Sequence, residues 1–274
     1  MRDRVVVITG AGANGGIGHA LALGFAREGA RLAVADSDAA GLAATATELE
    51  SLEAPHIACL CDIGVPSDIE RLFTDVREHF GRVDVLINVP FHFSRRVPPH
   101  EIGSEDWARS LAVNLTGYLL SCQAALRDML ERDEGGCLIN IGSNAGVGAL
   151  GRGALAYSCT KAAVHQMTRE IAVEYAASGI RCNAIVPAQT LTPGLAAHID
   201  TPAFRDTVLP RILSGLPQGR LLAPEDYVGP ALFLASTAAQ AVNGVLLPVD
   251  GGHLAMNPGG SPGPDHRAPR GTAP

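Results

Sequence analysis

The chain has 274 residues, of which 47% are hydrophobic and 18% are charged, with a formal net charge of −7. This composition can fill the core of one large α/β domain, and the acidic balance argues against a nucleic-acid-binding protein, which usually has a basic face. No apolar run approaches the ~18 residues that cross a bilayer, and the first one is too short for a signal-peptide core. The six cysteines and nine histidines show no disulfide or metal-binding spacing. We therefore expect a cytoplasmic protein without a metal site.

Short β-branched runs alternate with longer amphipathic patterns along the chain. We expect strands at 4–10, 31–36, 56–62, 83–88, 136–143, 180–187 and 244–250. Helices are expected between them at 16–30, 38–51, 66–80, about 105–132, around Tyr157, less regularly at about 193–215, and at 224–237. Strands that alternate with crossover helices predict an α/β fold with a doubly wound parallel sheet, covered by helices on both faces.

The C-terminal end has a different composition. Residues 257–274 contain five prolines and four glycines, and such a segment cannot bury enough apolar surface to become ordered. No internal repeat or linker divides the remainder. We expect a single domain over residues 1–256 and a disordered tail over 257–274.

The first predicted strand runs into "TGAGANGGIG" at residues 9–18, and a helix follows. Glycines at such a turn let backbone N–H groups approach a pyrophosphate at the positive end of the helix. Asp36 ends the second strand, where its carboxylate can accept hydrogen bonds from an adenosine ribose and would repel a 2′-phosphate. An ordinary helix cap is the alternative interpretation of Asp36, and Asp62 at the end of the third strand allows the same two interpretations. The pattern favours a dinucleotide site.

Lys161 is the only lysine of the chain, whose other twenty basic side chains are arginines. It follows Tyr157 by four residues, so the two side chains share a helix face. A compact ammonium beside a tyrosine lowers the pKa of the phenol from about 10 and prepares it for proton transfer. The alternative is a surface lysine that escaped a compositional bias. We favour a catalytic pair.

Taken together, these segments resemble the short-chain dehydrogenase/reductase family over about residues 4–253. The resemblance is carried by "TGAGANGGIG", Asp36, "CDI" at 61–63, "DVLIN" at 84–88, "LAVNLTG", "INIGS", "YSCTK", "IRCNAIVPAQTLTP", "PEDYVGPALFLAS" and "VDGG" at 249–252. It implies a Rossmann-type fold in which Tyr157 is the general acid/base and Ser143 helps to hold the substrate oxygen. Lys161 would bind the nicotinamide ribose and lower the tyrosine pKa, and Asn114 would complete a proton path through water.

The resemblance also implies a cofactor, NAD in preference to NADP. Its contacts would be Gly10, Gly16, Ile17, Gly18, Asp36, Asp62, Ile63, Asn88, Tyr157, Lys161, Thr190 and Thr192. The sequence departs from the family pattern at several places. The glycine loop is two residues longer, Asn88-Val89-Pro90-Phe91 replaces Asn-Asn-Ala-Gly, Ala188 and Thr190 replace the usual Gly and Ile or Val, and Ser143 precedes Tyr157 by one residue more than usual.

The implied reaction is the interconversion of a secondary alcohol and a ketone by hydride transfer. Enoyl reduction is less expected, because that branch of the family places its lysine farther from its tyrosine. A nucleotide-binding scaffold or sensor with little turnover is the alternative, motivated by the altered segment 88–91. The apolar composition of 189–217 favours a largely apolar small-molecule substrate, and Arg95 and Arg96 either hold an anionic group of it or are solvated. By resemblance we also expect a homotetramer or a dimer.

Overall fold

The computed structural model describes residues 1–199, 201–257 and 260. In this part of the chain seven strands form one parallel sheet in the order β3-β2-β1-β4-β5-β6-β7. The strands are β1 (Val5–Thr9), β2 (Arg31–Asp36), β3 (His56–Leu60), β4 (Val85–Asn88), β5 (Gly136–Ile141), β6 (Ile180–Pro187) and β7 (Leu246–Val249). The order reverses between β1 and β4, and in such sheets the crevice at this reversal is where ligands bind.

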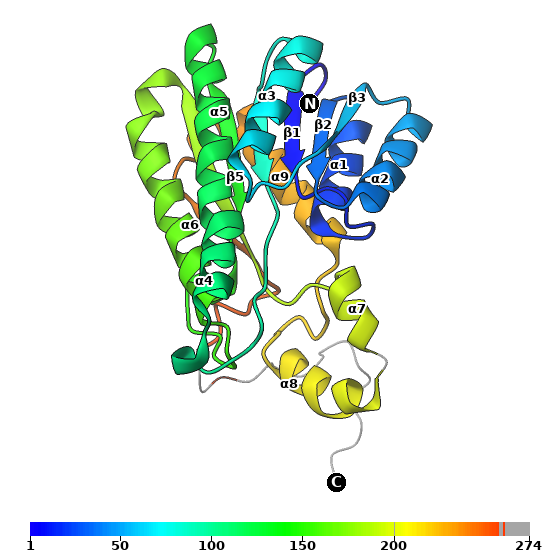
Figure 1. Cartoon of the computed structure of the whole chain (residues 1–274), viewed down its shortest axis with the longest axis vertical. Helices are drawn as coiled ribbons and strands as arrows, with labels where there is room; N and C mark the ends of the chain where they lie inside the picture. The colour runs from blue at the N-terminus through cyan, green and yellow to red at the C-terminus, as the bar shows by residue number, and fades with distance from the viewer. Residues whose placement is uncertain (200, 258–259, 261–274) are drawn as a thin grey trace, which may run out of the picture.

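The helices form layers on both faces of the sheet (Figure 1). They are α1 (Ile17–Arg27), α2 (Ala39–Ser51), α3 (Pro66–Phe80), α4 (Ser104–Leu111), α5 (Gly117–Arg132), α6 (Leu155–Glu174), α7 (Pro193–Ile199), α8 (Leu209–Ser214) and α9 (Val228–Ala235). The short helices α7 and α8 stand apart from the two layers at the lower end of the view (Figure 1). The doubly wound fold predicted from the sequence is confirmed.

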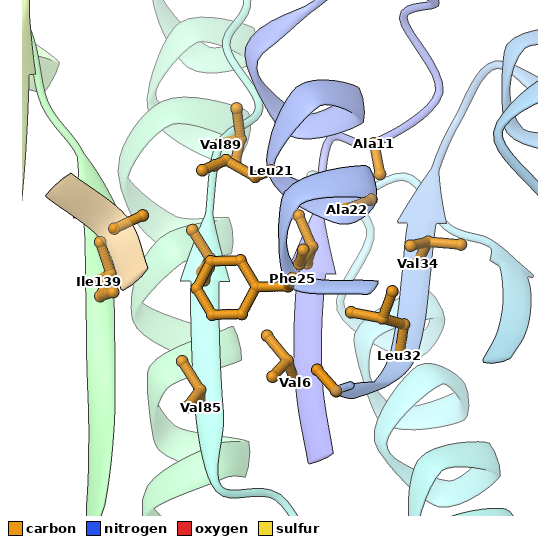
Figure 2. Packing of buried hydrophobic residues seen from close by; sticks show 14 of the residues in the cluster. Val6, Ala11, Leu21, Ala22, Phe25, Leu32, Val34, Val85, Val89 and Ile139 are labelled. Atoms are coloured by element: carbon orange, nitrogen blue, oxygen red, sulfur yellow. The ribbon is translucent and has the colours of Figure 1, made fainter. Parts of the chain in front are cut away.

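Each face of the sheet has its own apolar core because side chains alternate along a strand. Val6 of β1 packs with α1, α2 and α9, whereas Val7 belongs to the core under α3, α5 and α6. Figure 2 shows the first core, where the buried ring of Phe25 on α1 lies among Val6, Val85 and their neighbours. Strands buried on both faces are apolar nearly throughout, which explains the continuous runs in the sequence.

The long helix expected at 105–132 is interrupted. A π-helical turn over Ala112–Thr116 separates α4 from α5, and Asn114 lies inside it. Such turns shift the register of the following helix and occur frequently at functional sites. The apolar periodicity of the sequence did not reveal this turn.

The division of the chain was also predicted, as a domain over 1–256 and a tail over 257–274. Most of the tail lies outside the described residues, so both bounds remain predictions. In the part of the chain that the structure describes, no helix is long and apolar enough to span a membrane.

Candidate active site

The carboxyl ends of the central strands open into a cavity of about 520 Å³. It is lined by most of the residues predicted from the sequence: Gly10, Gly16, Ile17, Gly18, Asp36, Asp62, Ile63, Ser143, Tyr157, Lys161, Thr190 and Thr192. Two predicted residues, Asn88 and Asn114, are not part of the lining. The predicted residues that line the cavity come from six regions of the chain and meet in one site of the size that small-molecule ligands occupy.

The glycine loop is fitted closely to Asp36. Gly12 N–H donates to Asp36 Oδ2 at 2.8 Å, and Asp38 N–H donates to Asp36 Oδ1 at 2.9 Å. A Cβ on Gly12 would lie 2.7 Å from the Asp36 Cβ, so only glycine permits this approach. At the other end of the loop, a Cβ on Gly18 would collide with the carbonyl of Gly10. The Asp36 carboxylate is thus held at the cavity while part of it stays accessible.

His19 supports the longer glycine loop, a role that the sequence analysis missed. Its Nδ1 lies 3.3 Å from the Gly15 nitrogen, and its Nε2 lies 2.9 Å from Glu48 Oε1 on α2. With Nδ1 accepting, Nε2 carries the proton and donates to the carboxylate. The imidazole therefore ties the loop to α2.

Asp62 lines the cavity, and it has a partner that was not predicted. Arg109 on α4 lines the cavity as well and lies 2.6 Å from Asp62 Oδ2. The other oxygen of Asp62 accepts from Gly64 N–H at 2.8 Å. These contacts orient the carboxylate, and the cation of Arg109 is neutralised by it.

Tyr157 lies in the first turn of α6, and Ser143 follows the end of β5. Burial raises the pKa of Tyr157, while a hydrogen bond with the Ser143 side chain lowers it. The Ser143 oxygen also accepts from Ala145 N–H at 3.1 Å, and Ser143 N–H donates to His165 Nε2 at 3.3 Å. Burial and the nearby Lys161 lower the pKa of His165 to about 4, so this imidazole is a neutral acceptor that fixes the serine backbone. His165 was not singled out from the sequence.

Lys161 is only 1% exposed. Its Nζ donates to the Ile141 carbonyl at 2.7 Å and to the Tyr118 hydroxyl at 3.1 Å, and it lies 5.9 Å from the centre of the Tyr157 ring. Burial lowers the pKa of Lys161 to about 7. The sole lysine is therefore not a surface residue. The lowering of the tyrosine pKa by this cation stays a prediction.

Asn114 is fully buried, does not line the cavity, and joins two segments that contribute to the lining. Its Oδ1 accepts from His92 N–H at 2.6 Å, and its Nδ2 donates to the His92 carbonyl at 2.9 Å and to Thr160 Oγ1 at 3.2 Å. The amide thus holds the segment after β4 against α6. The proton path predicted for Asn114 stays a prediction.

Asn88 belongs to a buried polar row that crosses the sheet. It accepts from Thr9 Oγ1 at 3.1 Å and donates to Asn140 Oδ1 at 3.0 Å, and Asn140 in turn donates to Thr168 Oγ1 at 3.1 Å. The side chain of Asn88 is fully buried. Asn88 therefore links β4 to β1 and β5. The cofactor contact predicted for it stays a prediction.

Two phenyl rings flank Tyr157. The Phe93 ring centre lies 4.8 Å from that of Tyr157, and the Phe91 centre lies 6.1 Å away with the rings edge to face. Phe91 lines the cavity and is 57% exposed. The guanidinium of Arg96 lies over the Phe93 ring at 4.8 Å, and neither Arg95 nor Arg96 lines the cavity.

Thr190 and Thr192 also line the cavity. Thr190 Oγ1 lies 2.6 Å from the hydroxyl of the buried Tyr227 and 3.1 Å from the Ala188 carbonyl. The threonine that replaces the usual Ile or Val therefore joins the segment after β6 to the residue that precedes α9.

Comparison with known proteins agrees with this site. The family model described as "Enoyl-(Acyl carrier protein) reductase" matches residues 10–253. D-threitol dehydrogenase of Mycolicibacterium smegmatis is 35% identical over 91% of this chain and 92% of its own length. The chain belongs to the short-chain dehydrogenase/reductase family.

Two solved structures of this family are similar throughout. A protein from Burkholderia xenovorans described as a short-chain dehydrogenase/reductase has a TM-score of 0.88 at 34% identity, covering 93% of this chain and 98% of that one. A protein from Beutenbergia cavernae described as an NAD(P)-dependent gluconate 5-dehydrogenase, with NADP bound at low occupancy, has a TM-score of 0.85 at 34% identity, with the same coverage.

The chain is accordingly an NAD(P)-dependent oxidoreductase of the short-chain type that interconverts alcohol and ketone groups. The alternative of a scaffold with little turnover is not favoured. Within the described residues, no group of His, Cys, Asp and Glu side chains could hold a metal ion.

Proposed function

We propose that this dehydrogenase oxidises a secondary alcohol with Tyr157 as the general base and reduces the ketone with the same residue as the general acid. The observation that carries the proposal is the convergence of Ser143, Tyr157 and Lys161 on one cavity beside the glycine loop and Asp36. Nicotinamide, when bound, supplies the hydride chemistry. The chain's own groups bind, orient and move the proton.

The roles follow from the contacts. The ionised oxygen of Tyr157 takes the alcohol proton and becomes a hydroxyl, and Ser143, whose side chain lowers the pKa of Tyr157, orients the substrate oxygen from the second side. Lys161 has three donors, of which two are held by Ile141 O and Tyr118. The third is available to a ribose hydroxyl. Asn114 contributes by fixing the backbone of His92 at the floor of the site.

We propose NAD as the preferred cofactor. A 2′-phosphate would meet the Asp36 carboxylate, and like charges at such a distance repel. Among the described residues that line the cavity, the only cations are Lys161 and Arg109, and Arg109 is paired with Asp62. The similar Beutenbergia cavernae protein was solved with NADP bound. A preference of this chain for NAD would therefore be a difference between the two proteins.

The substrate is proposed to be largely apolar near its reacting carbon. The exposed ring of Phe91 beside Tyr157 is the main support, because a large apolar side chain exposed within a pocket commonly marks the place of an apolar ligand. The apolar segment 189–217, which includes α7 and α8, adds to it.

We further propose a homotetramer or dimer, on the basis of the family resemblance, and a cytoplasmic location. The free thiols of Cys61, Cys122, Cys137 and Cys182 in the core support a reducing compartment. Residues 257–274 are proposed to be a disordered tail because of their proline and glycine content.

The test is NADH production with a panel of secondary alcohols, from aryl and cyclic alcohols to polyols, with Tyr157→Phe as the control. Turnover by the wild type and loss of about 10²–10⁴ in kcat for the variant are expected. Equal turnover by both proteins would overturn the assignment of Tyr157.

A further inference from the structure

The side-chain nitrogen of Lys161 contacts Tyr118, a residue outside the motifs that define the site. Tyr118 on α5 is fully buried, and its hydroxyl lies 3.1 Å from Lys161 Nζ, 2.9 Å from the Pro90 carbonyl and 3.3 Å from the Ile141 carbonyl. An ammonium only donates hydrogen bonds. Lys161 therefore donates to the phenol oxygen, and the phenol proton goes to a carbonyl.

The distances determine the direction in which these hydrogen bonds run. The Ile141 carbonyl already accepts from Lys161 at 2.7 Å, and the Pro90 carbonyl is the nearer acceptor for Tyr118. The hydrogen bonds thus run from Lys161 to Tyr118 and on to Pro90. Pro90 belongs to the segment 88–91, which departs from the family pattern.

Tyr118 acts here as a neutral group. Burial raises its pKa well above the usual value of 10, and the neighbouring Tyr157 and Cys122 raise it further. The titratable groups around Lys161 are thus Tyr118 and, behind it, Cys122 on α5, and Tyr157 and His165 on its own helix. Among the described residues, Lys161 makes no ion pair with a carboxylate. Its charge depends on oxygen acceptors alone.

We infer that Tyr118 is a positioning residue for Lys161, whose hydroxyl holds the ammonium between β5 and the segment 88–91. Two donors of Lys161 are fixed in this way, and the side chain also lines the cavity, so the third donor points to the site. The catalytic consequence rests on the proposed function, whereas the contact itself does not.

The single lysine allows a direct test. Labelling with lysine carrying ¹³C at Cε gives one side-chain signal, and its titration reports the pKa of Lys161 in the full-length protein without turnover. A hydrogen bond to a charged group stabilises it by roughly one pKa unit or more. We expect Tyr118→Phe to lower the lysine pKa from about 7 by about one unit.

Tyr227→Phe is the matched control, because it removes the hydroxyl of another fully buried tyrosine whose partner is Thr190. It should leave the lysine titration unchanged. A lysine pKa that is unchanged or raised in Tyr118→Phe, or lowered equally by Tyr227→Phe, would overturn the inference.

Two further readouts complete the test. In alcohol oxidation, Tyr118→Phe should lower kcat by about tenfold, with a smaller effect on KM, because a lysine that loses its proton at lower pH supports the Tyr157 phenolate less. If no alcohol is turned over, the proposed function fails but the lysine titration still decides the contact. If Tyr118→Phe does not fold, it is combined with Lys161→Met: folding of the double variant supports the inference, and its failure contradicts it.

Discussion

Asn114 and His92 are joined by two hydrogen bonds, in which the asparagine amide accepts from the His92 N–H at 2.6 Å and donates to the His92 carbonyl at 2.9 Å. This pairing fixes the chain segment that follows β4 to the π-helical turn. The segment carries Phe91 and Phe93, so the position of both rings beside Tyr157 depends on it. The buried amide of Asn114 therefore helps to position the two phenyl rings beside Tyr157.

Asn114→Asp tests this pairing. The new carboxylate can still accept from the His92 N–H, but its second oxygen faces the His92 carbonyl and repels it. The position is fully buried, so burial raises the pKa of the aspartate in the folded state. Such a group destabilises the fold increasingly as the pH rises above its unfolded pKa of about 4. We expect a loss of about 3 kcal/mol at pH 8 and a clearly smaller loss at pH 5, measured by urea unfolding. Asn114→Ser is the control, with a similar loss at both pH values, and an equal loss for Asn114→Asp at pH 5 and pH 8 would contradict the pairing.

Asp36→Asn should narrow the preference for NAD. The amide keeps the shape of the side chain and removes the charge that opposes a 2′-phosphate, so the ratio of kcat/KM for NADP to that for NAD should rise by about tenfold or more, the effect of roughly 1.4 kcal/mol. Asp38→Asn alters the nearby cap of α2 and should leave the ratio unchanged. A wild-type enzyme that prefers NADP would show that Asp36 serves only the loop.

The buried charge of Lys161 should appear in the pH dependence of stability. The folded pKa of about 7 lies below the unfolded value of 10.5, so the unfolded chain binds more protons between these values and the stability contributed by this group rises with pH. Removing the charge with Lys161→Met should raise the free energy of unfolding at pH 6.5, and the gain should shrink by pH 9.5. A gain of the same size at both pH values in urea unfolding would argue against a lysine buried in this way.

Phe91→Ala tests the apolar wall. Loss of the ring should lower kcat/KM by about 5- to 30-fold for aryl or cyclic alcohols, the effect of removing roughly 1–2 kcal/mol of apolar contact, and should change the value for polyols less. Phe233→Ala removes another partly exposed phenyl ring, on α9 away from the cavity, and serves as the comparison. Equal losses in kcat/KM for both alcohol classes would show that Phe91 acts on cofactor binding or on the stability of the fold and does not contact the substrate.

Much of the fold follows from local patterns. The strand "RLAVAD", the helix "PSDIERLFTDVREHF" and the strand "IRCNAIVP" have the predicted bounds, because apolar runs between turn residues determine them. Asp36 and the glycine loop were predicted to form one dinucleotide site, and both line the cavity because parallel strands end at the same edge of the sheet. The hydrogen bond between Gly12 and Asp36 was not predicted.

The missed features depend on contacts between distant segments. Arg109 and Asp62 are 47 residues apart, and Lys161 and Tyr118 are 43 apart, and no periodicity connects them. The π-helical turn around Asn114 adds one residue to a helix whose apolar pattern continues on both sides. The family resemblance implied that Asn88 contacts the cofactor. In the structure its side chain is buried within the sheet, where Thr9 on β1 and Asn140 on β5 are its hydrogen-bond partners.

The most direct test of the account is kcat for alcohol oxidation by Lys161→Arg. The lysine nitrogen is enclosed by the Ile141 carbonyl and the Tyr118 hydroxyl with 1% exposure of the residue, and a planar guanidinium is too broad for this place. We predict a folded protein whose kcat is lower by about 10²–10⁴ and whose alkaline optimum is shifted upward as the pKa of Tyr157 rises. A folded Lys161→Arg enzyme with the kcat and pH profile of the wild type would contradict the account.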